Sequence, residues 1–397
     1  MAVVAAADET RPRTGGRGGP AATAAAAAVA TRRLSSTLSF YIGRQVMLGV
    51  GIVAFGLAAL AYVIDAVEIL REARDREGVG LGLILMMAGL HLPHLLQQLL
   101  PFSVLFGAML SFMRLNRTQE LVAARALGIS VWQFLTPALA FALGLGLVAV
   151  GVLNPIAAAM TERFERLDQL YMSDGVSLVS VSSGGLWLRQ QRGGDEELII
   201  HARHVAATDP AELRGVTVLV YAEEVRFAGR VDAPVAYLED GRWRLEDPLV
   251  AWPDGRIERR AEYLIPTDLT ARRMMDSFGP PETVSFWDLP EFIALLEAVG
   301  LPTTAHRLHL HALLAMPLLF CAMLLIGTTF SLRLVRRGGT GLLVGAGLAT
   351  AFAFFMFSDI VQAIGLSGQI PAALAAWTPA GVAILLGLAT LLHLEDG

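Results

Sequence analysis

The sequence predicts an α-helical membrane protein with six transmembrane helices and a β domain inserted between the third and the fourth. The chain is 54% hydrophobic and 17% charged, and its mean hydropathy of +0.55 is too high for a soluble globule. Long uncharged runs flank a stretch, residues 154–305, that holds 25 acidic residues against 15 arginines. Short alternating apolar and polar runs in that stretch favour strands.

Arginine supplies all 31 basic residues, because the sequence contains no lysine. A Walker A nucleotide loop and a Schiff-base enzyme both need a lysine, so the composition excludes these two functions for this chain. We therefore expect no cofactor here, and any ATP hydrolysis would belong to another subunit. The single cysteine, Cys321, lies in an apolar run and has no partner for an intramolecular disulfide.

Residues 1–37 are expected to form a disordered cytoplasmic tail, because this region is rich in Ala, Gly and Arg and poor in large apolar residues. The alanine run at 21–30 has some likeness to a signal peptide, and Thr31-Arg32-Arg33-Leu34 to a twin-arginine signal. Both interpretations are rejected, since the run is only weakly hydrophobic and a stronger span follows it.

Residues 38–154 contain the first three predicted spans. These cover about 38–64, 78–113 and 131–153. A short mixed-charge loop at 65–77 separates the first two. Pro93 and Pro101 are expected to bend the second span, which is longer than a bilayer requires. The third is expected to end at Asn154-Pro155.

A charged segment, RLNRTQELVAARALGIS, separates the second and third spans. Asn116 can cap a short helix and Gly128 can end it, which predicts a helix over about 114–128. Apolar residues share one side of this helix, with charged residues near its edge. The expected docking residues for a soluble partner are Arg114, Arg117, Glu120 and Leu121. The same arginines also suit an ordinary cytoplasmic loop.

Residues 155–305 are expected to form the β domain and a connecting helix. Alternating runs occur at 186–188 and 216–220, and the turn pairs Asp240-Gly241 and Asp254-Gly255 each lie between two such runs. This pattern is typical of a sandwich or a jelly roll. An amphipathic helix over 286–299 then leads back to the membrane.

Residues 306–397 contain the last three predicted spans. These cover about 308–332, 339–358 and 372–392. The loop after the fourth span holds Arg333, Arg336 and Arg337, and with six spans it lies on the same side as the Glu120 segment and the basic tail. By the positive-inside rule that side is the cytoplasm, so the acidic β domain is expected outside.

Histidines are the main candidates for a metal site or a catalytic site. His201 and His204 are three residues apart on an expected strand and would face opposite sides, so no metal site is expected there. Two other groups are His91 with His94, and His306 with His309 and His311. His91 and His94 flank Pro93 and are expected to be polar side chains at an interface or in a cavity. The group of His306, His309 and His311 is expected to lie at the membrane interface, or alternatively to form a pH-sensitive contact. No Ser-His-Asp set is evident.

The fifth predicted span carries an acid, Asp359, near its outer end. An acid within a span is a functional candidate, although a side chain that reaches the wet interface would need no function. In the same span Gly341-x-x-x-Gly345 allows close contact with a partner helix.

These features resemble the LptF/LptG family of lipopolysaccharide exporter permeases over about residues 40–392. The motifs that carry the resemblance are Thr118-Gln119-Glu120-Leu121-Val122, Gly185-Leu186-Trp187 and Gly241-Arg242-Trp243-Arg244-Leu245. The C-terminal residues Gly368-Gln369-Ile370-Pro371 and Ala376-Trp377-Thr378-Pro379, together with Asp359, are similar to the G-side branch of the family.

The resemblance implies an inner-membrane permease with cytoplasmic termini and a periplasmic jelly roll. It implies that Glu120 lies on a coupling helix that docks into a separate ATPase, which binds the ATP. The implied partners are an LptF-like second permease, a dimer of an LptB-like ATPase, an LptC-like bitopic protein and lipopolysaccharide, with no nucleic acid. The first and fifth spans would line an outward-facing cavity.

G-side members can carry a basic residue in the outer half of the first span, suited to lipid A phosphates. This chain has Tyr62 and Asp65 there, so Arg71 or Arg74 is expected to bind phosphate instead. The same arginines are equally suited to a solvated loop. Further expected substrate-binding residues are Pro101, Phe102, Phe355 and Asp359.

Two alternatives remain open. A permease for another lipid or for lipoprotein release would also couple to an ATPase, but the lipoprotein-release family has four spans and places its external domain after the first. A membrane-embedded lipid-modifying enzyme would need acids or histidines clustered at one interface, and here they are scattered along the sequence.

Overall fold

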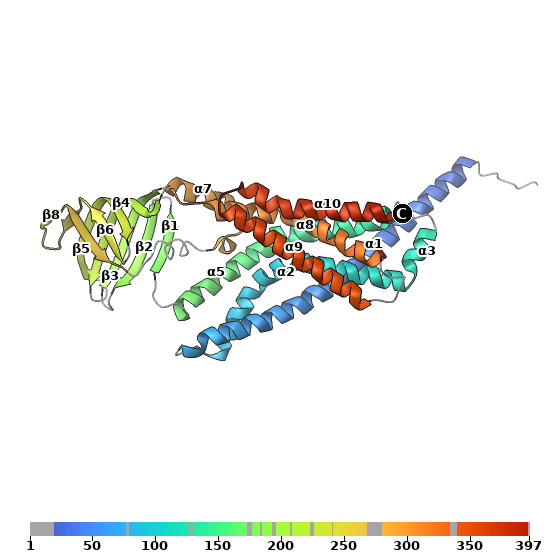
Figure 1. Cartoon of the computed structure of the whole chain (residues 1–397), viewed down its shortest axis with the longest axis horizontal. Coiled ribbons are helices and arrows are strands. Elements are labelled where there is room, and N and C mark those ends of the chain that lie inside the picture. The colour runs from blue at the N-terminus through green and yellow to red at the C-terminus, as the bar shows by residue number, and fades with distance from the viewer. Residues whose placement is uncertain are drawn as a thin grey trace, which may run out of the picture.

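A bundle of long helices and an antiparallel sheet occupy opposite ends of the molecule (Figure 1). The computed structural model describes residues 20–395 apart from 77–78, 127–129, 173–176, 183–184, 193–195, 207–208, 223–225, 240, 268–279 and 334–339. Within the described residues, six helices are long and apolar enough to cross a membrane. They are α1 (Pro20–Glu72), α2 (Leu81–Arg117), α4 (Val131–Val148) with its continuation, α8 (Thr304–Arg333), α9 (Thr340–Leu366) and α10 (Ala372–Glu395). The predicted architecture is confirmed.

Helix α1 is longer at both ends than expected. It begins at Pro20, inside the expected tail, because alanine is the strongest helix former and fills residues 21–30. It also continues through most of the expected loop to Glu72, and the 3-10 turn η1 (Ala73–Asp75) follows. Ile69 and Ala73 are buried against α2, so an apolar face stabilises this extension. That face was not predicted, because charged residues surround Ile69 and Ala73 in the sequence.

Small residues allow α1 and α2 to cross closely. A Cβ added to Gly107 would lie 2.5 Å from the α1 backbone, and one added to Gly49 would lie 2.7 Å from the Gly107 carbonyl oxygen. The Ser111 hydroxyl donates a hydrogen bond to the Gln45 carbonyl oxygen at 3.0 Å. Small residues at such crossings are typical of membrane helices. Among the described residues, a Cβ added to Gly341 or Gly345 of the predicted Gly341-x-x-x-Gly345 motif would meet nothing within 4 Å.

The third span does not end where it was expected to. After α4 a π-helical turn, η2 (Ala149–Leu153), leads directly into α5 (Asn154–Tyr171). Pro155 does not stop the helix, because the π-turn before it widens the helix and the Gly151 carbonyl oxygen, four residues earlier, accepts a hydrogen bond from the Trp287 indole at 3.1 Å in place of the N–H that proline lacks. The β domain therefore begins at Ser177, later than the expected residue 155.

The described strands form one antiparallel sheet in which neighbours along the chain mostly pair. They are β1 (Ser177–Ser182), β2 (Gly185–Arg192), β3 (Glu196–Ala206), β4 (Asp209–Ala222), β5 (Arg226–Glu239), β6 (Arg242–Glu246), β7 (Leu249–Ala251), β8 (Ile257–Arg259) and β9 (Glu262–Pro266). The order is β1-β2-β3-β4-β5-β6-β9, and β7 pairs with β5 and β8. Alternating residues from most strands bury a core around Trp243.

Both predicted hairpins are present. Glu239 pairs with Arg242 across a two-residue turn, and Gly241 has a φ of 75°. Ala251 pairs with Ile257 around Gly255, whose φ is 85°. Glycine adopts these left-handed conformations without a steric penalty, which is why the two Asp-Gly pairs predicted the turns.

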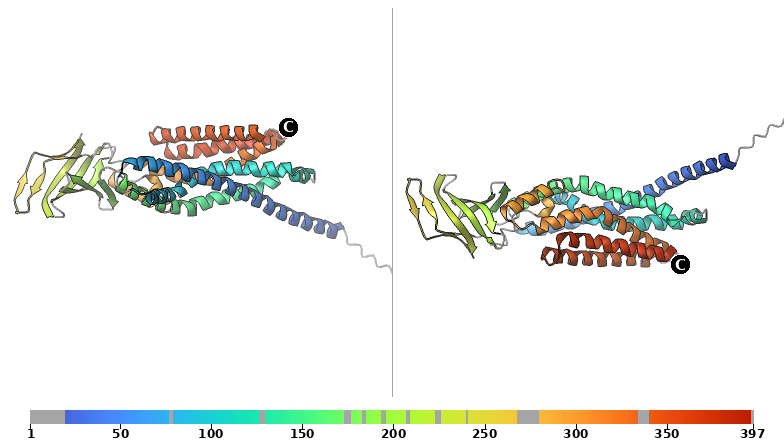
Figure 2. Two further views of the ribbon diagram at one scale, coloured as in Figure 1. Left: turned by 90° about the horizontal axis from the view of Figure 1, so that it is seen from below. Right: turned by 90° about the horizontal axis from the view of Figure 1, so that it is seen from above.

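The chain returns to the bundle through a short 3-10 turn, η3 (Pro281–Thr283), and α7 (Leu289–Val299). The expected connecting helix is thus present, although it begins three residues later. Helices α9 and α10 then lie together along one side of the bundle (Figure 2). The remaining described helix, α3 (Glu120–Ala126), lies at the end of the bundle away from the sheet (Figure 1).

Candidate functional site

Glu120 is the first residue of α3. The Thr118 hydroxyl donates to the Arg114 carbonyl oxygen at 3.1 Å and closes the last turn of α2. Gln119 then adopts a left-handed conformation, with φ of 59°, and turns the chain into α3. The expected helix over 114–128 is therefore wrong at its start, because Arg114 and Arg117 belong to α2. Gly128 lies outside the described residues.

The predicted cap residue Asn116 does not cap α3. Its amide lies 3.5 Å from the Ser331 carbonyl oxygen of α8. The preceding residue, Leu115, is buried, so tertiary packing extends α2 beyond Asn116. This contact joins segments more than two hundred residues apart, and no local sequence pattern indicates it.

Helix α3 has one anchored residue beside exposed neighbours. The Leu121 side chain is 5% exposed and packs into the main apolar core, whereas Val122 is 50% exposed and Glu120 is also exposed. The Tyr41 hydroxyl of α1 interacts with the Glu120 carboxylate. Leu121 thus fixes α3 to the bundle, while the Glu120 carboxylate remains exposed. Arg114 is exposed nearby on α2. Sequence reasoning missed the Tyr41 contact.

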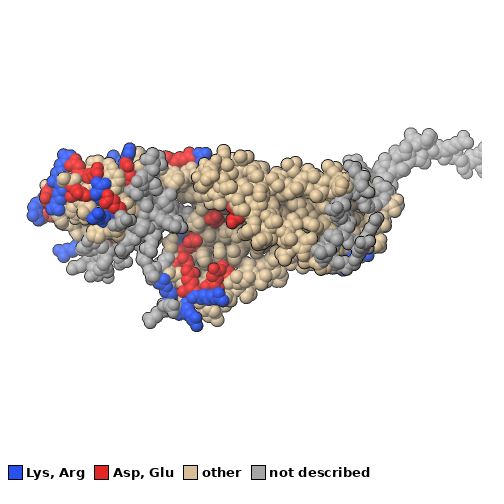
Figure 3. Space-filling model, in the orientation of Figure 1, with Lys and Arg blue, Asp and Glu red and all other residues tan. Residues whose placement is uncertain are grey.

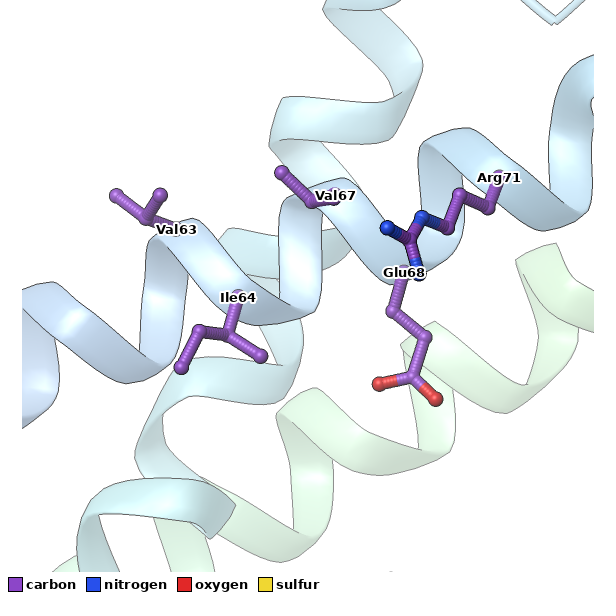
Figure 4. A pocket seen from close by; sticks show the side chains of 5 residues that line it. All are labelled: Val63, Ile64, Val67, Glu68 and Arg71. Carbon is purple, nitrogen blue, oxygen red and sulfur yellow. The ribbon is translucent and has the colours of Figure 1, made fainter.

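Arg71 lines a groove near the C-terminal end of α1. The groove has a volume of ≈ 550 Å³ and is lined by Val63, Ile64, Val67, Glu68 and Arg71 (Figure 4). In Figure 4 the Arg71 side chain reaches along the helix toward Glu68. Three apolar side chains beside one cation suit an acyl chain whose headgroup is anionic. Arg74 is exposed on η1 and does not line the groove.

The other expected substrate-binding residues are divided between two environments. Phe102 of α2 and Phe355 of α9 approach with ring centroids 6.4 Å apart. Asp359 is exposed one helical turn after Phe355. Pro101 is buried inside the bundle and presents no open surface. The structure thus joins two of these residues in one contact between α2 and α9.

A polar cluster joins α1, α2 and α5. His91 Nδ1 lies 2.9 Å from Asp65 Oδ1, and the His91 ring stacks on Phe164 at 4.8 Å. The His94 ring stacks on the other side at 5.5 Å, and Gln98 Nε2 lies 2.9 Å from His94 Nε2. Asp65 Oδ2 is buried without a hydrogen-bond partner among the described residues. The signal for this cluster was an acid at the end of an apolar run, since Asp65 and His91 are distant in sequence.

Acidic side chains gather in a recess of the bundle, at its end toward the sheet (Figure 3). Glu165 interacts electrostatically with Asp168 and Glu282, and Asp168 with Glu72. These residues come from α5, η3 and α1. The recess is therefore negatively charged, and it does not have the chemistry of a phosphate site.

The remaining histidines do not form a metal site among the described residues, where no group of three metal-binding side chains occurs. The His201 ring contacts Trp187, with ring centroids 4.3 Å apart and the ring planes tilted by 38°. His306 is buried beside Phe292 of α7, with ring centroids 5.3 Å apart.

Comparison with known proteins gives a match along nearly the whole chain. A family model described as lipopolysaccharide export system permease LptF/LptG matches residues 40–393. The chain is 23% identical over 364 residues to the lipopolysaccharide export system permease protein LptG of Escherichia coli strain K12, a match that covers 90% of this chain and 98% of that protein. It is 22% identical over 349 residues to the protein of the same name from Haemophilus influenzae strain KW20, covering 87% and 95%.

Proposed function

Because the chain belongs to the LptF/LptG family of lipopolysaccharide export permeases, we propose that it is the G-side permease of an ATP-driven exporter. In this proposal it extracts lipopolysaccharide from the outer leaflet of the inner membrane and passes it to a periplasmic bridge. A separate ATPase subunit binds and hydrolyses the ATP. The absence of lysine supports this division of labour, since a Walker A loop cannot be built from this chain.

The observation that carries the proposal is the geometry of α3. A helix that is displaced by a soluble partner must be packed against the bundle and must also expose a side chain that the partner can bind. Leu121 provides the fixed contact and Glu120 the exposed carboxylate. Because Val131 begins α4 only a few residues after α3 ends, displacement of α3 moves the third span directly. Differential binding of the ATPase to two positions of α3 would supply the coupling free energy.

The groove on α1 supports the substrate side of the proposal. Its apolar residues would contact acyl chains, and burial of a CH₂ group stabilises by about 0.8 kcal/mol. Arg71 would bind a lipid phosphate at the rim. Since the acyl chains leave one apolar environment for another, the cost falls mainly on moving the charged headgroup. ATP hydrolysis would supply the free energy for moving the headgroup.

The orientation and the assembly follow from the charge distribution and the resemblance. Arg114 and Arg117 end α2 at the face opposite the sheet, which favours a cytoplasmic location for that face and a periplasmic location for the β domain. The proposed partners are a second, LptF-like permease, two copies of an LptB-like ATPase and an LptC-like bitopic protein. Gly341 and Gly345 have no described neighbour within 4 Å of an added Cβ, and they suit a helix from a partner subunit.

The test is co-purification of the ATPase and second permease with this chain, comparing wild type with Glu120→Ala. We expect the wild type to retain the ATPase and the variant to lose it, or to hydrolyse ATP without extracting lipid. Losing a charge-assisted contact costs about 1.5–3 kcal/mol, equivalent to roughly a tenfold or larger loss of affinity.

Glu262→Ala is the matched control, because Glu262 is an exposed glutamate of β9 far from α3. It should retain the ATPase as the wild type does. The proposal fails if the wild-type chain purifies without an ATPase, or if Glu120→Ala and Glu262→Ala behave alike.

A further inference from the structure

The π-turn η2 gives the third membrane span an unusual surface. Within it the Asn154 N–H donates to the Ala149 carbonyl oxygen, five residues back instead of four. A π-turn holds one more residue than an α-turn, so it widens the helix and shifts its carbonyl groups away from their usual partners. Turns of this kind inside long helices frequently mark functional positions.

Two hydrogen bonds join this turn to the chain that returns from the β domain. The Phe286 backbone N–H donates to Asn154 Oδ1 at 2.8 Å, and Trp287 Nε1 donates to the Gly151 carbonyl oxygen at 3.1 Å. Asn154 is only 3% exposed, so its hydrogen bond is costly to lose. We call these two bonds the π-turn clasp. They join segments more than 130 residues apart in sequence.

Helix α7 continues from the clasp and has two apolar faces. Leu289 and Ile293 pack with Val150, a residue of the π-turn itself. One to two turns later, Leu296 and Val299 are part of the apolar core of the sheet. A single short helix is therefore packed into the bundle at one end and into the β domain at the other, as Figures 1 and 2 show.

The far end of α7 is fixed to the sheet by close backbone contact. Gly300 ends the helix in a left-handed conformation, with φ of 87°. A Cβ at this position would lie 2.3 Å from the Val205 carbonyl oxygen of β3. Helix and strand therefore touch without an intervening side chain, which leaves little room for independent movement.

We propose that the π-turn clasp is the mechanical connection through which the third membrane span moves the β domain, with Asn154 and Trp287 as its positioning residues. Movement would pass from α3 through α4 to η2, and from η2 through α7 to β3. This inference rests on the proposed function, because it takes α3 as the point where force enters. Its role is to align the β domain with the lipid leaving the bundle.

The first experiment measures the rigidity of the connection in the full-length protein alone, so that it does not depend on transport. Spin labels are placed at Thr136 on α4 and Arg256 on the β7–β8 turn, both exposed, in a Cys321→Ser background that removes the one native thiol. We expect a narrow distance distribution for this protein. Trp287→Phe keeps an aromatic ring and removes the N–H donor, and it should broaden the distribution.

Trp252→Phe is the matched control, because Trp252 is another exposed tryptophan that lies in the β domain away from the clasp. It should leave the distribution narrow. Trp287 is 66% exposed, so Trp287→Phe should not disturb folding. Asn154→Ala is a second, more severe variant, and it is interpreted only beside Trp287→Phe. Unchanged distributions in Trp287→Phe would overturn the proposal.

The second experiment separates hydrolysis from transfer in the assembled complex. With Trp287→Phe, ATP hydrolysis should stay at the wild-type level, while lipopolysaccharide transfer to a soluble β-domain acceptor falls about fivefold or more, the usual range for a lost coupling. A purely structural role would lower both in parallel and would overturn the proposal. A wild-type complex without transfer contradicts the proposed function, while the distance measurement still tests the clasp.

A covalent replacement provides the rescue. In the cysteine-free background, Gly151→Cys with Trp287→Cys places two thiols where a Cβ on Gly151 would lie 3.7 Å from the indole ring. This protein carries no spin labels, and before treatment it should show the weak transfer of Trp287→Phe. A short bifunctional thiol crosslinker should restore transfer. Failure of a completed crosslink to restore transfer would count against the clasp.

Discussion

Arg71 is the residue on which the substrate side of the proposed function depends. It is the cation that lines the groove on α1, beside Val63, Ile64 and Val67. We expect Arg71→Ala to weaken lipopolysaccharide stimulation of ATP hydrolysis, raising the half-maximal lipid concentration about fivefold, because one exposed charge-assisted contact contributes about 1 kcal/mol. Titration of the purified complex with lipopolysaccharide provides the measurement.

Two controls accompany that substitution. Arg71→Lys retains the charge and should recover part of the effect, whereas Arg256→Ala removes an exposed arginine of the β domain and should have none. Since Arg74 is close by, Arg71→Ala/Arg74→Ala is the decisive variant. If the lipid titration of the double variant matches wild type, neither arginine binds the phosphate.

Asp232 gives the sheet a specific acid sensitivity. Burial raises the pKa of its carboxyl, but hydrogen bonds from Arg230 and Thr217 outweigh burial and hold the pKa below its usual 3.8. A depressed pKa stabilises the folded state above pH 3.8, and this contribution is lost as the pH falls through the lower, folded-state value. We expect Asp232→Asn to lower stability by less than about 1 kcal/mol near neutral pH, since the pair is partly exposed.

The measurement is a urea titration of the intact protein, read by hydrogen exchange of peptides from β4 and β5. At pH 7 the wild-type midpoint should exceed that of Asp232→Asn, and the difference should shrink progressively as the pH falls below 3.8. A difference that stays constant as the pH falls would show that the carboxylate charge has no part in the effect.

Some residues of the candidate sites were predictable and others were not. Glu120 was found because it follows a charged loop between two apolar runs, and Asp65 was visible as an acid near the end of a span. Their partners Tyr41 and His91 were not predicted as partners. Tertiary folding makes these pairs, and a single sequence carries no signal for two helices that cross at one point.

Among the elements, the crossing of α1 and α2 depends on Gly107. Alanine there would place its Cβ 2.5 Å from the Val50 backbone, which cannot move aside as a flexible side chain can. We expect Gly107→Ala to destabilise the bundle by about 1–3 kcal/mol, the usual cost of overpacking. Thermal unfolding in detergent micelles gives the measurement.

Gly89→Ala is the matched control, because Gly89 is in the same helix and a Cβ there meets nothing within 4 Å. Because alanine has a higher helix propensity than glycine, Gly89→Ala should leave the stability of the bundle unchanged or raise it by up to about 1 kcal/mol. Equal unfolding temperatures for the two alanine variants would mean that α1 and α2 do not cross at Gly107.

Element boundaries were less predictable than element types. The spans and the Asp-Gly hairpins followed from apolar length and turn chemistry, which act locally. The end expected at Asn154-Pro155 was wrong because the π-turn carries the helix past the proline, and Trp287 supplies the hydrogen bond that the proline cannot. The residues after it, from Thr161 to Tyr171, are amphipathic, and both the Glu162–Arg166 ion pair and the packing of α5 against α2 support their helix.

On the scale of the whole molecule, the untested expectation is its orientation across the membrane. The β domain and α3 lie at opposite ends (Figure 1), so one labelling experiment addresses both. In a Cys321→Ser background, Arg256→Cys should react with a membrane-impermeant maleimide once the outer membrane is opened. Val122→Cys on α3 should react only after the inner membrane is also opened. The reverse pattern would invert the proposed orientation, and with it the direction of transport.

The π-turn η2 also constrains how the gene can change. Its five residues are Ala149, Val150, Gly151, Val152 and Leu153, all with small or aliphatic side chains, and Ala149 and Val150 are buried. Because a π-turn holds one residue more than an α-turn, deletion of a single codon would convert it to an α-helical turn and keep Ala157 and Ala158 of α5 close to their buried positions. The carbonyl groups of the turn would then regain partners within the helix, so the Gly151 oxygen would no longer be available to Trp287. We therefore expect such a deletion to be tolerated by the helical bundle and to remove the π-turn clasp.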